Sequence, residues 1–324
     1  HYEFESICAI ENCPYSVIGN VTDEKQLILH DGNSKIIDLP MNYLLGKPPI
    51  TKIFLKNFIS NYKKQIYTYD SFTKSIYNIL QLPSVADKGF LITIGDRTVT
   101  GLVSQDQMIG HNQVPISNVS TTMSYIGSKN GQVMTMGERP FISITNPSAS
   151  ADIAFGEIIT NISCAYIGDL SNIKLSANWM ASSKNHNELE ALYLGVDRIS
   201  KLCRDFNITI PVGKDSLSMN TKWSDKSIHK EVESPMSLVL SAFSSIKDVN
   251  KLISPALKGK GNIFLLDIAM GKTRLGGSAL HQIHNIIDPD VPYLDNIKHL
   301  KLFFNFVQKL VQNNTISAYH DKSD

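Results

Sequence analysis

The stretch Ser150–Asn161 (SADIAFGEIITN) predicts a helix that packs against the core of the protein. Pro147 and Ser148, just before it, are typical of a helix start. Glu157 and Asn161 stand four residues apart, so their side chains share one helix face. A carboxylate and an amide oxygen one turn apart can both face a hard cation such as Mg²⁺. A solvated polar stripe would have the same spacing, but here the polar line is narrow and its neighbours are apolar.

Strands and helices alternate on both sides of this helix, which predicts an α/β or α+β fold. Helical periodicity extends the central helix over 149–165 and predicts others over 187–206, Ser278–Ile287 and 295–313. Short apolar runs predict strands at Ser16–Val21, Gln26–His30, Ile36–Leu39, Phe90–Ile94, Thr98–Val103, Phe141–Thr145, Lys174–Asn178, Thr209–Val212, Met236–Phe243, Asn262–Ile268 and Ile316–Tyr319.

The length of 324 residues allows about two domains. We expect residues 1–50 to end a preceding domain with a hairpin, and 51–85 to form a linker with one or two helices. Residues 86–250 would be the main domain, and 258–324 the start of another, after a segment rich in Lys, Ser, Pro and Gly. Since the chain has no starting Met and stops after an acidic turn, we expect an internal piece of a longer polypeptide.

Composition excludes several classes of protein. The net charge is +1 and the basic residues are scattered, which argues against nucleic-acid binding. No apolar run reaches the roughly 18 residues of a membrane span. The four cysteines lack metal spacing, so we expect reduced thiols in a cytoplasmic protein. Neither a nucleophile elbow nor a Cys–His hydrolase signature is present.

Polar residues after predicted strands are further site candidates, because ligands gather at strand ends in open α/β sheets. Asp321 and Ser323 follow the last predicted strand and suit a cation and a phosphate, although a plain polar turn would look the same. Gly213–Ser216 (GKDS) suits a phosphate turn, with Gly213 and Ser216 facing the ligand, but it lacks the Walker pattern and a simple strand-to-strand turn is equally consistent. Asp96 and Arg97 suit an ion pair or a substrate contact.

Several long motifs resemble one enzyme family. GDRTVTGLVSQDQMIG, GERPFISI, SADIAFGEIITNIS, IGDLSNIKLSANWMA, IPVGKDSLSM and AYHDKSD look like the phosphoribosylformylglycinamidine synthases (FGAR amidotransferases) of the long, multidomain type. The resemblance runs almost end to end. It implies a synthetase core of two repeated halves, each like aminoimidazole ribonucleotide synthetase. Residues 1–50 would then end the first half, 86–250 would be the N-terminal subdomain of the second half, and 258–324 would begin its C-terminal subdomain.

The resemblance also implies a magnesium–nucleotide site. The family's magnesium ligands fall on Asn118, Glu157, Asn161 and Asp321, and its ATP or ADP contacts fall on Ser117 and Ser323. Asn118 stands where the family pattern has Asp, which keeps an oxygen ligand but removes a negative charge. Gly213 and Ser216 are weaker nucleotide candidates.

The reaction implied is the ATP- and glutamine-dependent conversion of formylglycinamide ribonucleotide to formylglycinamidine ribonucleotide in purine synthesis. The family's catalytic His and its glycine-rich ATP loop belong to the first half, and its glutaminase is a separate domain, so this piece alone should be inactive. Two alternatives remain open. Either the nucleotide is structural, which would make this part a binding module, or the chain is another member of the aminoimidazole ribonucleotide synthetase superfamily.

Overall fold

A computed structural model describes all residues except 49–51, 56, 65, 94, 96–100 and 323–324. It divides the chain into two units, 1–54 and 55–324. Unit 1 contains α1 (Tyr2–Ile10), the antiparallel hairpin β1 (Gln26–Asp31) and β2 (Ser34–Pro40), and α2 (Met41–Leu45). The predicted hairpin is confirmed, but Ser16–Val21 is not a strand. Cys8 is the one buried hydrophobic side chain among the described residues of this unit, so the unit has almost no core.

Unit 2 is built on a six-stranded sheet in the order β3-β4-β5-β10-β6-β7. Its strands are β3 (Val103–Gln105), β4 (Ser120–Met123), β5 (Gly131–Glu138), β6 (Lys174–Met180), β7 (Thr209–Ser216) and β10 (Ser237–Ile246). Neighbouring strands are antiparallel except β6 and β7, which are parallel. The parallel pair needs a long crossover, and α7 (His186–Phe206) supplies it. The mixed α/β class that the sequence predicts is therefore confirmed.

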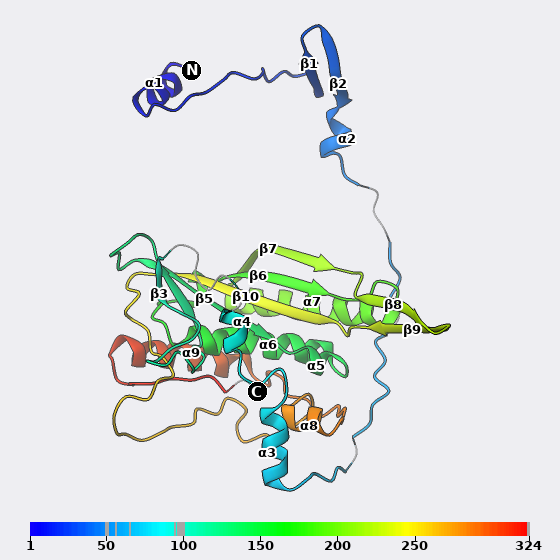
Figure 1. The fold of residues 1–324 in the computed structure, drawn as a ribbon, viewed down its shortest axis with the longest axis vertical. Coiled ribbons are helices and arrows are strands. Elements are labelled where there is room, and N and C mark those ends of the chain that lie inside the picture. The colour runs from blue at the N-terminus through cyan, green and yellow to red at the C-terminus, as the bar shows by residue number, and fades with distance from the viewer. Residues whose placement is uncertain (49–51, 56, 65, 94, 96–100, 323–324) are drawn as a thin grey trace. The chain divides into compact units, whose positions relative to one another are not determined.

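Helices cover one face of this sheet. Figure 1 shows α6 (Pro147–Ile162) and α7 side by side against β5, β10 and β6, with α9 (Ile297–Gln312) next to α6. Residues on alternate positions of β10, such as Leu238, Leu240 and Ala242, are buried beneath these helices. Phe155 of α6 and Phe304 of α9 are fully buried in the same core. The core therefore lies between the sheet and this helical layer.

The remaining elements are short. They are α3 (Phe72–Leu80), α4 (Gly89–Thr93), α5 (Pro140–Ser143), the 3₁₀ turn η1 (Leu170–Asn172), the hairpin β8 (Asn220–Asp225) and β9 (Ile228–Glu233), and α8 (Ala279–Ile283). No helix among the described residues is both long and apolar enough to cross a membrane. The four cysteines, all within the described ranges, are free thiols.

Several predicted elements are wrong, each for a local reason. Phe90–Thr93 belongs to the helix α4 rather than to a strand, since the Asp87 carboxylate accepts the Gly89 N–H and opens a helical turn. Phe141–Ser143 belongs to α5, because Pro140 is suited to the first turn of a helix. Asn262–Ile268 and Ile316–Tyr319 form no strand. Ile263, Phe264 and Leu265 are strongly exposed, since no neighbouring strand pairs with them in the described part of the chain.

One buried amide fastens α9 to the turn after α6. Gln308 Oε1 accepts the N–H groups of Ile167 (2.9 Å) and Gly168 (3.0 Å). Its Nε2 donates to the carbonyls of Ser163 (2.9 Å) and Ala165 (2.8 Å). The side chain is almost fully buried. All four hydrogen-bonding positions of the amide are thus used, and four backbone groups of the turn depend on it.

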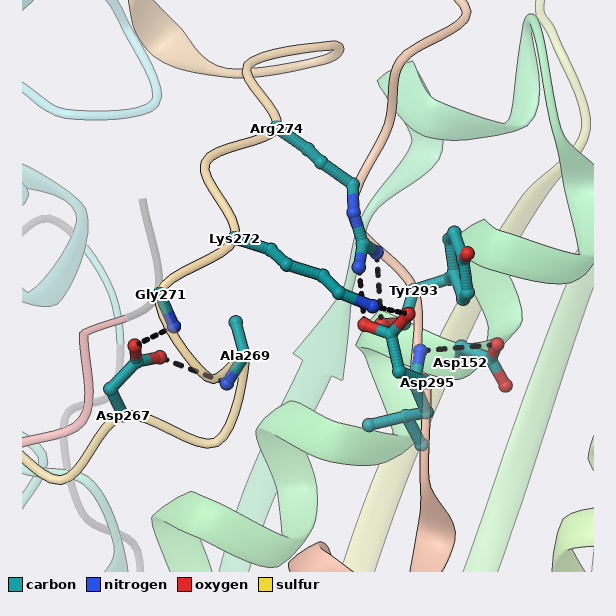
Figure 2. Close-up of polar contacts among 9 residues, drawn as sticks. Asp152, Asp267, Ala269, Gly271, Lys272, Arg274, Tyr293 and Asp295 are labelled. Carbon is teal, nitrogen blue, oxygen red and sulfur yellow. Dashed lines mark hydrogen bonds and ion pairs between the residues drawn. The ribbon is translucent and has the colours of Figure 1, made fainter.

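A partly buried ion pair connects α6 to α7. Arg198 Nε of α7 lies 2.5 Å from Asp152 Oδ1 of α6, and the other oxygen of Asp152 accepts the Leu294 N–H at 3.3 Å. Figure 2 shows that the same segment is fastened one residue later, where Asp295 pairs with Lys272 and Arg274. The Arg274 guanidinium also lies over the Tyr293 ring, 4.1 Å from its centroid. The segment around Leu294 is therefore held against the first half of α6.

Candidate functional site

Three parts of the chain meet where β5 ends beside α6. Asn118, just before β4, is buried, and its carbonyl oxygen accepts the Thr135 hydroxyl of β5 at 2.8 Å. Its Oδ1 lies 2.7 Å from His320 Nδ1, which is 202 residues away in sequence. The residue after His320 is Asp321. The predicted ligand Asn118 is thus directly linked to the segment that carries the predicted ligand Asp321.

Glu157 faces the last residues of β5. Its Oε2 accepts the Glu138 N–H at 2.9 Å, and its Oε1 lies 3.7 Å from Arg139 Nη2. Burial raises the pKa of the Glu157 carboxyl to about 7, which the Arg139 guanidinium and the Glu138 N–H oppose. The negative charge of Asp321 raises this pKa further, so Asp321 is within electrostatic reach of Glu157.

Asn161 lies one turn beyond Glu157 and is also buried, with 9% of its surface exposed. Its Nδ2 donates to the Met136 carbonyl at 3.3 Å, so both predicted ligands of α6 face the end of β5. On the same helix, the Thr160 carbonyl accepts the Tyr319 hydroxyl at 2.7 Å. This bond holds the segment that leads into Asp321 against α6.

The structure therefore brings Asn118, Glu157, Asn161 and Asp321 into one neighbourhood. Ser117 is adjacent to it, where its hydroxyl donates to the Val119 carbonyl at 2.7 Å and accepts from Gln105 Nε2 at 2.6 Å. Ser323 lies outside the described residues, as do Asp96 and Arg97.

Gly213 and Ser216 are not part of this neighbourhood. The predicted GKDS turn is wrong, since residues 213–216 continue β7 and pair in register with Ala177–Met180 of β6. In the strand order, β7 is three strands from β5, which is about 14 Å at ordinary strand spacing. The Gly–Lys–Asp–Ser pattern is typical of a turn, but strand pairing along the sheet edge overrides it.

The residues present fit a hard divalent cation. Two carboxylates and two amides supply the oxygen ligands that Mg²⁺ prefers. Asn118 also has a buried amide atom, Nδ2, with no hydrogen-bond partner; as an N–H donor it would be satisfied by an acceptor such as a phosphate oxygen, not by a cation. Among the described residues, no group of three or more His, Cys, Asp and Glu side chains forms a metal cluster. The set found here is of a different kind, because half of its members are amides.

Sequence reasoning missed the partners of these residues. Arg139 and the Glu138 N–H hold Glu157, and His320 holds Asn118. Arg139 lies between β5 and α5, and Pro140, which is typical of a helix start, is the one sequence signal for a strand end at this point. No sequence signal connects His320 with Asn118.

Close packing positions Glu157. A Cβ on Gly137 would lie 2.5 Å from the Ala154 carbonyl oxygen and 2.9 Å from Ile158 Cγ2, so β5 and α6 approach each other here because residue 137 has no side chain. We expect Gly137→Ala to lower the unfolding free energy by about 2 kcal/mol, through overpacking, and to displace Glu157 from the Glu138 N–H. Urea denaturation measures the first effect.

Gly156→Ala is the matched control for this substitution. Its Cβ would meet only Leu294 Cδ2, at an ordinary 3.7 Å. Because alanine is the better helix former, this variant should be neutral or up to about 1 kcal/mol more stable. Equal losses in both variants would contradict the close-approach argument.

Comparison with known proteins agrees with the predicted resemblance. Residues 87–245 match the family model of the FGAR-AT PurM_N-like domain. This segment contains the six-stranded sheet, except the last residue of β10, together with α6 and α7.

Solved structures give more distant matches. PurLQS from Thermotoga maritima is 11% identical with a TM-score of 0.46, covering 72% of this chain and 34% of that chain. PurL from T. maritima complexed with ATP is 10% identical with a TM-score of 0.46, covering 90% of this chain and 38% of that chain. Thiamine monophosphate kinase from Aquifex aeolicus is 11% identical with a TM-score of 0.26, covering 42% and 40%.

The chain thus spans well under half of the length of these structures. The assignment rests on the family match, which covers both the sheet and the helix that carries Glu157 and Asn161. Residues 87–245 thus form an FGAR-AT PurM_N-like domain, in agreement with the family that the motifs of the chain resemble.

Proposed function

We propose that Asn118, Glu157, Asn161 and Asp321 form a magnesium–nucleotide site in the synthetase core of an FGAR amidotransferase. The observation that carries this proposal is the meeting of three distant segments at the end of β5, a strand of the domain that matches the family. Electrostatic repulsion between Asp321 and Glu157 supports it, because two nearby carboxylates are stabilised by a cation between them.

Each residue would have its own role at this site. Glu157 and Asp321 would supply the charged oxygens for Mg²⁺, and Asn118 and Asn161 would supply neutral ones. Ser117 and Ser323 would contact ATP or ADP. Bound magnesium would neutralise phosphate charge. The charge of Arg139 opposes the effect of burial on the pKa of Glu157, and so favours the ionised carboxylate that would bind the cation.

The wider activity is part of the same proposal. The intact protein would be a ligase that converts formylglycinamide ribonucleotide to its amidine in the cytoplasm, using ATP and ammonia from glutamine, with a glutaminase domain as partner. Residues 86–250 and 258–324 would be the N- and C-terminal subdomains of its second synthetase half, 51–85 a linker, and 1–50 the end of the first half.

Nucleotide content tests the site. In the intact protein, we expect Glu157→Gln to lower retained nucleotide roughly 10- to 100-fold. Glutamine keeps an acceptor for the Glu138 N–H but removes one of two negative ligands. Asn161→Ala should lower the content less, because it removes a neutral ligand. Extraction and quantification of the nucleotide, with Asp205→Ala at an exposed position of α7 as control, measures these effects.

Thermal melts and turnover of the same variants distinguish a structural nucleotide from a reactive one. A structural nucleotide stabilises only the folded protein, so its loss should lower the melting temperature. Loss of a reactive nucleotide should lower the rate while the melting temperature stays nearly constant. Full nucleotide content with an unchanged melt and rate in Glu157→Gln would remove Glu157 from the site.

A further inference from the structure

Asn118 and His320 form a contact in which the oxygen of the Asn118 amide has a partner and its nitrogen has none. Asn118 Oδ1 lies 2.7 Å from His320 Nδ1, while Asn118 Nδ2 is buried and has no hydrogen-bond partner. Asn118 is 7% exposed, so bulk water does not solvate the amide freely. The Asn118 backbone is fixed separately, through the bond from the Thr135 hydroxyl to its carbonyl. The amide group is therefore held in place but incompletely satisfied.

Rotation of this amide by 180° exchanges its oxygen and its nitrogen without moving the side chain elsewhere. With Oδ1 toward His320, the ring must donate from Nδ1. The N–H groups of Asn118 then point to the side of the amide that has no partner, called the open position below. With Nδ2 toward His320, the ring accepts at Nδ1 and carries its proton on Nε2. Asn118 then directs Oδ1 at the open position. The structure has the first arrangement, and only the second, with the amide rotated, offers a ligand to a cation.

We infer that His320 is a positioning residue, which turns the Asn118 amide so that its oxygen faces the bound cation. This inference rests on the proposed magnesium–nucleotide site. His320 does not touch the cation in this arrangement. It accepts the Asn118 N–H, and so fixes both its own tautomer and the direction of the ligand oxygen, as outer-shell partners of metal ligands commonly do.

A carboxylate at position 118 would not need to be oriented by His320, because both of its oxygens can bind a cation. A double-mutant cycle therefore separates orientation from other roles of His320. In the intact protein, we expect His320→Ala to weaken Mn²⁺ binding in the presence of ADP by about 10-fold. In the Asn118→Asp background, the same change should weaken binding less than about 3-fold, since the carboxylate presents an oxygen in either orientation.

Electron paramagnetic resonance of bound Mn²⁺ measures the affinity, and the signal that disappears in Glu157→Gln identifies this site. His229→Ala, on the exposed hairpin β8–β9, is the control histidine variant. Thermal melts of the four proteins in the cycle show whether His320→Ala also destabilises the fold.

The outcomes are distinct. A 10-fold effect only with Asn118 supports the orienting role, whereas equal effects in both backgrounds, or none in either, would overturn it while leaving the magnesium site intact. Wild-type protein without a Glu157-dependent Mn²⁺ signal would overturn the proposed function, and this inference with it.

Discussion

Gln308→Leu is expected to lower the free energy of unfolding by about 4 kcal/mol. Leucine fills most of the space but makes none of the four hydrogen bonds of the Gln308 amide. The N–H groups of Ile167 and Gly168 and the carbonyls of Ser163 and Ala165 then stay buried without this partner. Each buried group left unpaired costs about 1–3 kcal/mol, and local rearrangement recovers part of the sum.

Urea denaturation followed by circular dichroism measures this loss. Gln312→Leu is the matched control, because Gln312 is exposed one turn later on α9. It should change the stability by no more than about 0.5 kcal/mol. A Gln308→Leu protein as stable as the control would mean that water or backbone movement satisfies the turn without Gln308.

Arg198→Met should cost about 3 kcal/mol at pH 7, because it leaves the Asp152 carboxylate buried without its counter-charge. Asp152 has 6% of its side chain exposed, and its remaining hydrogen bond comes from the Leu294 N–H. Methionine keeps the aliphatic part of the arginine, so lost packing contributes little. The contacts of α6 with α7 and with the segment around Leu294 would both be weakened, because Asp152 makes both.

The loss in Arg198→Met should shrink as the pH falls. Burial already raises the pKa of Asp152 in the folded protein, and Arg198 opposes this rise. Without Arg198, the folded pKa lies further above the unfolded value, so the folded state binds a proton more readily and gains stability as the pH falls through that pKa. Denaturation midpoints at pH 7 and pH 5 measure the difference. Arg204→Met, at an exposed position of α7, is the control.

A loss in Arg198→Met that is the same at both pH values would contradict this account. It would indicate that the stabilisation from Arg198 comes from packing between α6 and α7 rather than from the charge of Asp152.

Strong periodicity made the long helices predictable. The apolar residues of α6, α7 and α9 recur at helical spacing over at least 16 residues each, so single residues that break the pattern do not hide it. β5 was missed because its inward positions, Gly131, Val133, Thr135 and Gly137, include only one large apolar residue. Small residues are needed there because α6 lies close, and no pattern within one strand reports the distance to its neighbour.

For the candidate site, the sequence by itself determined that Glu157 and Asn161 share one face of a helix, because a helix repeats every 3.6 residues. Its long motifs also indicated the family that the domain match at residues 87–245 supports. Only the tertiary structure decided that Glu157 is held by Arg139 and the end of β5, that Gly213–Ser216 is strand rather than turn, and that His320 contacts Asn118. Such contacts join residues 18 to 202 positions apart, where no local periodicity constrains the pairing and the packing of the whole sheet and its helices selects the neighbours.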